Sequence, residues 1–261
     1  MNSISSSYYA ALAIAYGVSL LGWWLINLWK PIIWKYDTVY PFQHPWRETL
    51  WVLLAAIGTI GIGQLYSHNL LLPETGVVKS PLTNSINQII IFFPFILLLF
   101  IRHQPFSTVW LPSQFPLIRV GVGIALALCA IIVFLLIRKP EPSFFDIIAG
   151  VYHPKNLGYA VQVFLQDCSV AMLLVRFKAA VGKKWFLWVI IVVAFLFSAS
   201  HYPLKMTQGL SFITATREIL IDGLLVSGIL YVIQRSQDIL WFWCIHFAMD
   251  MMQFYAGKPD V

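Results

Sequence analysis

The chain has 261 residues, of which 59% are apolar, 16% aromatic and only 11% charged. A soluble domain carries about 25% charged residues and a disordered chain combines low hydrophobicity with high charge, so both classes are excluded. The mean hydropathy of +0.78 predicts an integral membrane protein. Its net charge of +6 is typical of such proteins, because Lys and Arg collect in cytoplasmic loops. No basic run interleaved with aromatic residues indicates a nucleic-acid surface.

Apolar stretches of roughly 20 residues, the length a helix needs to cross a bilayer, recur along the chain. We predict an all-α, polytopic membrane bundle of about eight transmembrane helices. The eight ranges are 8–29, 48–67, 83–101, 116–138, 157–177, 184–200, 213–234 and 238–256. The first stretch follows a start that lacks a positive n-region, so we expect it to be retained. Because the connections are short, we interpret residues 1–261 as a single integral membrane domain, expected in the plasma (inner) membrane.

The basic residues and the tryptophans indicate how the helices sit in the bilayer. Eight crossings would place ten Lys and Arg residues on one side and seven on the other, which favours both termini outside the cytoplasm. Tryptophan clusters near helix ends are typical interfacial anchors. We interpret Trp23, Trp24 and Trp29 in the first helix, and Trp241 and Trp243 in the last, in this way.

A small set of polar side chains falls inside the apolar stretches. A charged group at the bilayer centre costs about 2.5–3.5 kcal/mol on insertion scales, so those that persist usually face a cavity or a partner. His246 and Asp250 are four residues apart and therefore share one helix face, and Phe197 and His201 repeat this spacing. The candidate residues are Gln166, Asp167, His201, Asp222, His246 and Asp250.

Two imidazoles with carboxylate and amide groups on separate helices fit two kinds of hydrolytic site. They could polarise a water and donate hydrogen bonds to a developing oxyanion. They could instead ligate a divalent metal such as zinc, which lowers the pKa of a bound water. A third interpretation is structural, since such groups also hold helices together by hydrogen bonds.

Other polar residues have simpler interpretations. We expect Asp222 to be structural, paired with Arg217 or with a group on the last helix, and Arg217 and Glu218 to be interfacial. Four further histidines lie in loops or near helix ends, where an imidazole is solvated: His44, His68, His103 and His153.

The order of these residues resembles the CPBP family (CAAX protease and bacteriocin-processing, or Abi) of intramembrane peptidases. The stretch 195–203 contains Phe197-x-x-x-His201, which is similar to the second family motif, F-x-x-x-H. A glycine-spaced helix follows, with Gly223 and Gly228, and His246-x-x-x-Asp250 is similar to the third motif, H-x-x-x-N/D. The resemblance covers roughly residues 157–256, which we expect to form a CPBP-like core.

The chain departs from the first family motif, E-E-x-x-x-R, at the corresponding place. Gln166 replaces the first glutamate, Asp167 the second, and Ala171 the arginine, while Arg176 lies five residues further on. The resemblance implies that His201 orients or activates water and that His246 and Asp250 stabilise the tetrahedral intermediate. Asp167 is the remaining candidate base in this helix, because a glutamine amide takes up no proton.

Two functions from different classes follow from this comparison. The first is a divergent CPBP-type endopeptidase that cleaves a membrane-embedded or lipidated peptide with activated water. The second is a catalytically inactive homologue that serves as a membrane scaffold, a partner-binding protein or an immunity-type protein. A transporter ranks last, because it would repeat its polar residues in both halves, whereas here they are concentrated in one half.

Overall fold

The computed structural model describes residues 6–29, 40, 42–72, 80–140, 142–207 and 209–255, and every regular element in these ranges is helical. The longer helices are α1 (Ser6–Trp29), α2 (Pro45–Ser67), α5 (Pro116–Arg138), α7 (Leu157–Val181), α8 (Phe186–Ser200), α10 (Phe212–Ser236) and α11 (Ile239–Tyr255). The shorter helices are α3 (Pro81–Ile91), α4 (Phe93–Ile101), α6 (Phe144–Val151) and α9 (Tyr202–Thr207). Three 3-10 turns join them: η2 (Phe106–Val109), η3 (Pro154–Asn156) and η4 (Lys183–Trp185).

The structure confirms the prediction of an all-α fold with several apolar helices of membrane-spanning length, but it does not confirm their predicted number. Among the described residues, five helices are long and apolar enough to cross a membrane, namely α1, α2, α5, α7 and α8 with their short extensions. Counting the bent pair α3 and α4 as one span gives six. Eight crossings are not confirmed, since the apolar part of α11 is short and α10 carries four charged side chains.

The segment predicted as one helix over 83–101 is broken in the structure. α3 ends at Ile91 and α4 begins at Phe93, with a bend of 55° between them. Pro94 explains the break, because it has no N–H to donate and its ring collides with the carbonyl four residues earlier. The same proline packs close to Gly58 of α2.

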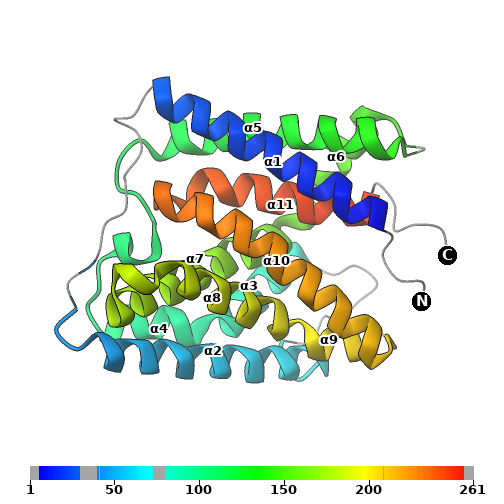
Figure 1. The fold of residues 1–261 in the computed structure, drawn as a ribbon. Helices are drawn as coiled ribbons and strands as arrows, with labels where there is room; N and C mark the ends of the chain where they lie inside the picture. Colours follow the sequence, from blue (N-terminus) through cyan, green and yellow to red (C-terminus); the bar gives the residue numbers. More distant parts are fainter. Residues whose placement is uncertain are drawn as a thin grey trace.

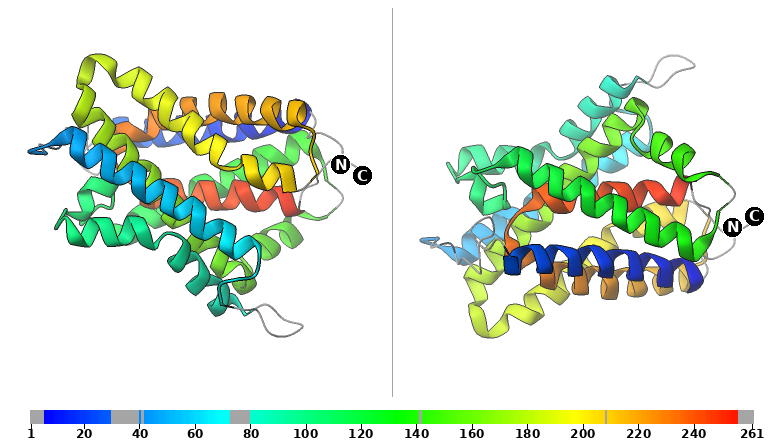
Figure 2. Two further views of the ribbon diagram at one scale, coloured as in Figure 1. Left: turned by 90° about the horizontal axis from the view of Figure 1, so that it is seen from below. Right: turned by 90° about the horizontal axis from the view of Figure 1, so that it is seen from above.

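Helix α11 lies at the centre of the bundle (Figure 1). It packs against α5 on one side and α7 on the other, α1 packs against α5, and α10 against α8. α2 and α3 cover the far side of α7. Figure 2 shows α1 in blue alongside α5 and α10, with the start of α1 and the end of α11 at the same end of the bundle. α7 and α11 are thus neighbours deep in the molecule.

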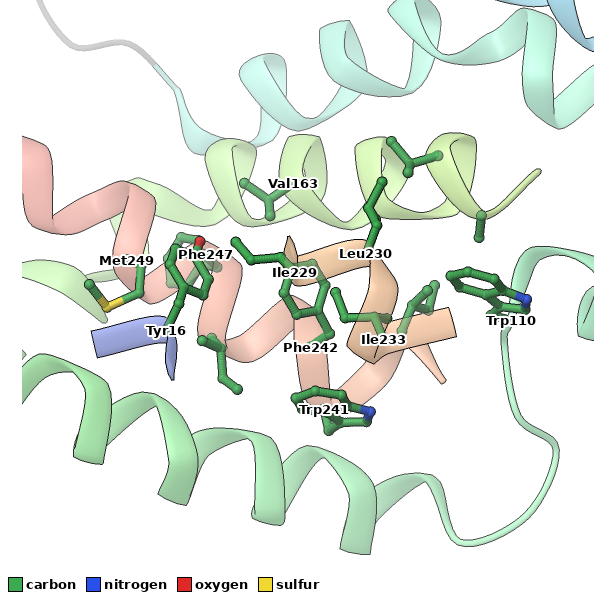
Figure 3. Close-up of a cluster of buried hydrophobic side chains, with 14 of the residues drawn as sticks. Tyr16, Trp110, Val163, Ile229, Leu230, Ile233, Trp241, Phe242, Phe247 and Met249 are labelled. Atoms are coloured by element: carbon green, nitrogen blue, oxygen red, sulfur yellow. The ribbon is translucent and has the colours of Figure 1, made fainter. Parts of the chain in front are cut away.

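The core is apolar and aromatic, and it corrects part of the tryptophan interpretation (Figure 3). Trp241 is fully buried and Trp23 is almost so, and their rings stack 5.1 Å apart at 7°. These two tryptophans are therefore core residues and not interfacial anchors, because α1, α5 and α11 pack around them. Trp24 and Trp29 are exposed, as interfacial anchors would be.

One glycine of the glycine-spaced helix marks a close contact between helices. A Cβ at Gly223 would lie 2.7 Å from the ring of Phe195, so α10 approaches α8 more closely than any other residue would allow. Small residues permit such approaches between membrane helices. A Cβ at Gly228, by contrast, would have no atom within 4 Å. The contact holds the end of α8 and the His201 that follows it against α10.

Candidate functional site

A carboxylate of α7 and an imidazole of α11 form the centre of the site. Asp167 Oδ1 lies 2.8 Å from His246 Nδ1. Asp167 comes ten residues into α7 and His246 seven residues into α11, so both lie well inside their helices. Their side chains are only 6% and 13% exposed. The structure therefore brings two of the predicted residues into direct contact in the interior.

A second carboxylate and a tyrosine extend this contact toward the surface. His246 Nε2 lies 3.5 Å from Asp250 Oδ2, and the Tyr159 hydroxyl donates to the same oxygen at 3.2 Å. The Asp250 side chain is 31% exposed. Asp167, His246, Asp250 and Tyr159 thus form a polar chain, here named the α7–α11 cluster, which runs from the interior toward the end of the bundle where α7 begins and α11 ends.

His201 follows the last residue of α8 and is held by two contacts. Its Nδ1 lies 3.1 Å from the Phe197 carbonyl oxygen, and the Phe197 ring meets the imidazole edge-on at 5.0 Å. Its Nε2 lies 3.5 Å from Nε2 of Gln166. The four-residue spacing of Phe197 and His201 therefore has a geometric meaning, because it places a backbone acceptor under one ring nitrogen.

The two imidazoles lie against neighbouring faces of α7. Gln166 and Asp167 are consecutive, so their side chains point about 100° apart around the helix. Gln166 meets His201, and Asp167 meets His246. The predicted residues are therefore assembled as two adjacent pairs, and Asp167 pairs with the imidazole of α11.

Several buried polar atoms in this region have no hydrogen-bond partner among the described residues. They are Asp167 Oδ2, the Ser198 hydroxyl and the Tyr202 hydroxyl. Ser198 and Tyr202 flank His201 in sequence, and Asp167 belongs to the other pair. Buried polar groups are nearly always paired with protein or water. The region around both imidazoles thus retains hydrogen-bonding capacity for a water or a polar ligand.

The arrangement does not favour a metal site. Among the described residues, no group of three or more His, Cys, Asp and Glu side chains could hold a metal ion. In the α7–α11 cluster the two carboxylates lie at opposite ring nitrogens of His246. They form a line through the ring and do not converge on one point, as metal ligands must.

Asp222 has a different partner from those predicted, and it shares that partner with Glu218, for which no partner was predicted. Lys205 Nζ lies 2.8 Å from Glu218 Oε2 and 3.4 Å from Asp222 Oδ2. Tyr9 of α1 also interacts with Asp222. Arg217 is exposed, and Glu218 is buried within the protein. The reason is that α9 continues α8 past His201 and carries Lys205 to the side of α10. The loop histidines are exposed, as predicted: His44, His68, His103 and His153.

Arg176 belongs to a separate network at the opposite end of α7. Its guanidinium donates to the Gln104 amide oxygen and, at 3.3 Å, to the Thr108 carbonyl. Gln104 in turn donates to Glu48 at 2.7 Å, and Arg102 donates to Glu48 at 2.6 Å. These five residues, here named the Arg176 network, are far along α7 from Asp167. Arg176 therefore does not take the place of the family arginine.

Tyr159 is the site residue that the sequence interpretation missed. It precedes Gln166 by seven residues on α7, which places both on one helix face. Its ring also packs against Phe247 and Phe254 of α11. The helical spacing was a usable signal, but a tyrosine near a helix end is equally typical of the membrane interface. Comparison with protein-family models, curated proteins and solved structures finds no match to this chain.

Proposed function

We propose that the chain is a divergent CPBP-type intramembrane endopeptidase of the plasma (inner) membrane. It would cross the bilayer about eight times and cleave a membrane-embedded or lipidated peptide with activated water. The observation that carries the proposal is that the two imidazoles have different hydrogen-bond partners. His201 lies beside a backbone carbonyl and the Gln166 amide, whereas His246 lies between two carboxylates.

His201 is suited to act as a base. A carbonyl oxygen only accepts, so the hydrogen bond to Phe197 places the ring hydrogen on Nδ1. Nε2 then carries the lone pair, and its contact with the Gln166 amide is long, at 3.5 Å. A water that displaces this amide could give its proton to Nε2. Gln166 would orient that water and take up no proton itself.

His246 is suited to act as a hydrogen-bond donor. Ionised carboxylates accept only, so Asp167 and Asp250 both favour a hydrogen on the nitrogen that faces them. The shorter contact, to Asp167, fixes the orientation of the ring. Because the contact to Asp250 is longer, the hydrogen on Nε2 is available to an oxyanion. Asp167 becomes a positioning residue for His246 in this proposal, and His201 takes the part of the base.

The reaction balances as a hydrolysis. The water oxygen bonds to the peptide carbonyl carbon while its proton moves to His201 Nε2. The carbonyl oxygen takes the negative charge and receives a hydrogen bond from His246 Nε2. The carbon–nitrogen bond then breaks, and the proton held by His201 passes to the leaving amine. Water is consumed, and a carboxylate and an amine are released.

A proteoliposome assay tests the proposal. The full chain is reconstituted with fluorescence-quenched transmembrane peptides and with prenylated peptides, and the rate of fluorescence release is measured. Loss of a general base costs typically about 10²–10⁴-fold, so we expect that loss for His201→Ala. The exposed His103→Ala serves as the matched control and should cleave like wild type. Equal rates for wild type and His201→Ala would contradict the mechanism.

One observation favours the inactive homologue instead. Gln166 contacts His201 where the family pattern has a glutamate. Gln166→Glu in the same assay separates the two functions. If only this variant cleaves, the chain is a homologue that has lost its base and acts as a scaffold or binding protein. If wild type cleaves, the imidazole chemistry described above is sufficient.

A further inference from the structure

A groove opens on the surface of the bundle over the C-terminal half of α7. It has a volume of about 500 Å³, with α7 as its floor and α2 and α8 as its sides. Figure 2 shows the face from below, with α2 in light blue. Its lining is almost entirely apolar and includes Trp46, Phe177, Trp185, Trp188, Val189 and Val192. The groove lies at the end of the bundle opposite the termini, away from the α7–α11 cluster.

Three tryptophans place the mouth of the groove at the level of the lipid headgroups. Trp46, Trp185 and Trp188 are 64%, 51% and 60% exposed, respectively. Tryptophans gather where the acyl region meets the headgroups. Val189 and Val192 continue the lining along α8, away from the α2 end that carries Trp46. The groove therefore begins at the interface and runs into the hydrocarbon region.

Basic residues adjoin two of the lining tryptophans, Trp46 and Trp185, in the sequence. Arg47 adjoins Trp46, and Lys183 and Lys184 form the turn that precedes α8. All three are exposed, and no acidic partner faces them among the described residues. The Lys184 ammonium lies 5.8 Å from the Trp185 ring. This end also carries the larger share of Lys and Arg, which predicts the cytoplasmic side, where the leaflet is rich in anionic lipids.

We propose that this groove binds one anionic phospholipid, with an acyl chain along α7 and the phosphate at Lys183, Lys184 and Arg47. An apolar groove next to exposed cations matches the two halves of such a molecule. Basic pockets between membrane helices on the cytoplasmic side bind anionic headgroups in this way. The site is independent of the proposed peptidase activity, because it shares no residue with it.

Native mass spectrometry of the purified full chain tests the proposal. Phosphatidylglycerol and phosphatidylcholine with identical acyl chains are titrated separately, and dissociation constants are read from the bound fractions. We expect one phosphatidylglycerol to bind more tightly than phosphatidylcholine. Each lysine near the surface contributes a free energy equivalent to about a fivefold change, so Lys183→Gln/Lys184→Gln should weaken phosphatidylglycerol binding about 25-fold.

Two controls make the result decisive. Lys139→Gln/Arg217→Gln removes two exposed cations at the other end of the bundle and should leave binding unchanged. Glycerol phosphate, which has the phosphate and no acyl chain, should not compete. The proposal is overturned if phosphatidylcholine binds equally, if the control pair weakens binding as much, or if glycerol phosphate competes. Thermal midpoints measured without lipid verify that all variants remain folded.

Discussion

Helix α7 carries two buried polar regions that differ in how completely their groups are paired. In the Arg176 network, Glu48 accepts from both Arg102 and Gln104, and Gln104 also accepts from Arg176. In the α7–α11 cluster, one oxygen of Asp167 has no partner among the described residues. In the first region both oxygens of the Glu48 carboxylate are paired, although Arg176 Nε has no partner among the described residues, whereas in the second region a carboxylate oxygen stays available.

The difference teaches how a membrane protein separates stability from chemistry. A buried charge that loses its partner is strongly destabilising, so the Arg176 network, in which both oxygens of Glu48 are paired, is suited to hold α2, α4 and α7 together. An incompletely paired cluster contributes less to folding and can bind a water or a substrate. The same type of substitution should therefore reduce activity in the α7–α11 cluster and stability in the Arg176 network.

The largest expected effect is on activity. Asp167→Asn keeps the side-chain shape and an oxygen that can accept from His246 Nδ1, but it removes the charge that favours the imidazolium. We expect cleavage to fall about a hundredfold or more, with little change in thermal midpoint. The measurement is the proteoliposome assay together with a thermal melt. A variant that unfolds while its residual folded fraction cleaves normally would reverse the comparison.

The corresponding change in the other region should act on stability. Glu48→Gln removes the carboxylate between Arg102 and Gln104 and leaves the buried Arg176 without a compensating charge. Leaving buried donors without the carboxylate that accepts from them costs about 2–3 kcal/mol in free energy of unfolding, measured by denaturant titration in detergent micelles. The exposed Arg217→Gln is the control and should change little. A loss below about 1 kcal/mol for Glu48→Gln would show that the Arg176 network is not stabilising.

A smaller effect tests the frame around His201. Gly223→Ala places a Cβ 2.7 Å from the Phe195 ring, and overpacking of this kind costs typically about 1–3 kcal/mol. Gly228→Ala, with open space at its Cβ, should be neutral or slightly stabilising in the same titration. Adding Phe195→Leu should restore much of the loss at Gly223. Equal effects at the two glycines would mean that α8 and α10 are not in close contact.

The smallest effect concerns the outer end of the α7–α11 cluster. Tyr159→Phe removes the hydrogen bond to Asp250 and keeps the ring packing on Phe247. We expect a loss of about 0.5–1.5 kcal/mol in free energy of unfolding, and only a severalfold change in cleavage. Asp250→Asn in the Tyr159→Phe background completes a double-mutant cycle. Strict additivity of the two changes would show that the pair is not coupled.

Much of the fold could be predicted from apolar length and composition. Each of the eight predicted ranges falls largely on helix within the described residues, although 83–101 is divided between α3 and α4, because a chain in lipid must satisfy its backbone internally and forms helices wherever apolar residues persist. The crossing count was less predictable, since charges in α10 and the short apolar part of α11 weaken the signal. Pro94 was visible in the sequence as a helix breaker, but its 55° bend depends on packing against α2.

The sequence predicted which residues form the candidate site better than it predicted which of them contact one another. Helical spacing identified His246 with Asp250 and Phe197 with His201, since both are local contacts along one helix face. Spacing could not decide which imidazole meets Asp167, because that depends on how α7 is rotated between α8 and α11. A rotation of about 100°, or one residue, would bring Asp167 to the position that Gln166 holds beside His201.

The amino-acid sequence by itself determined that this chain is helical, that it is suited to a membrane, and which side chains share a helix face, because these properties follow from composition and from a fixed helical period. Only the tertiary structure decided that Trp23 and Trp241 stack inside the core, that Lys205 reaches Glu218, and that a carboxylate of α7 holds the imidazole of α11. Such contacts join residues far apart in the chain, and their geometry depends on how whole helices rotate and cross when they pack.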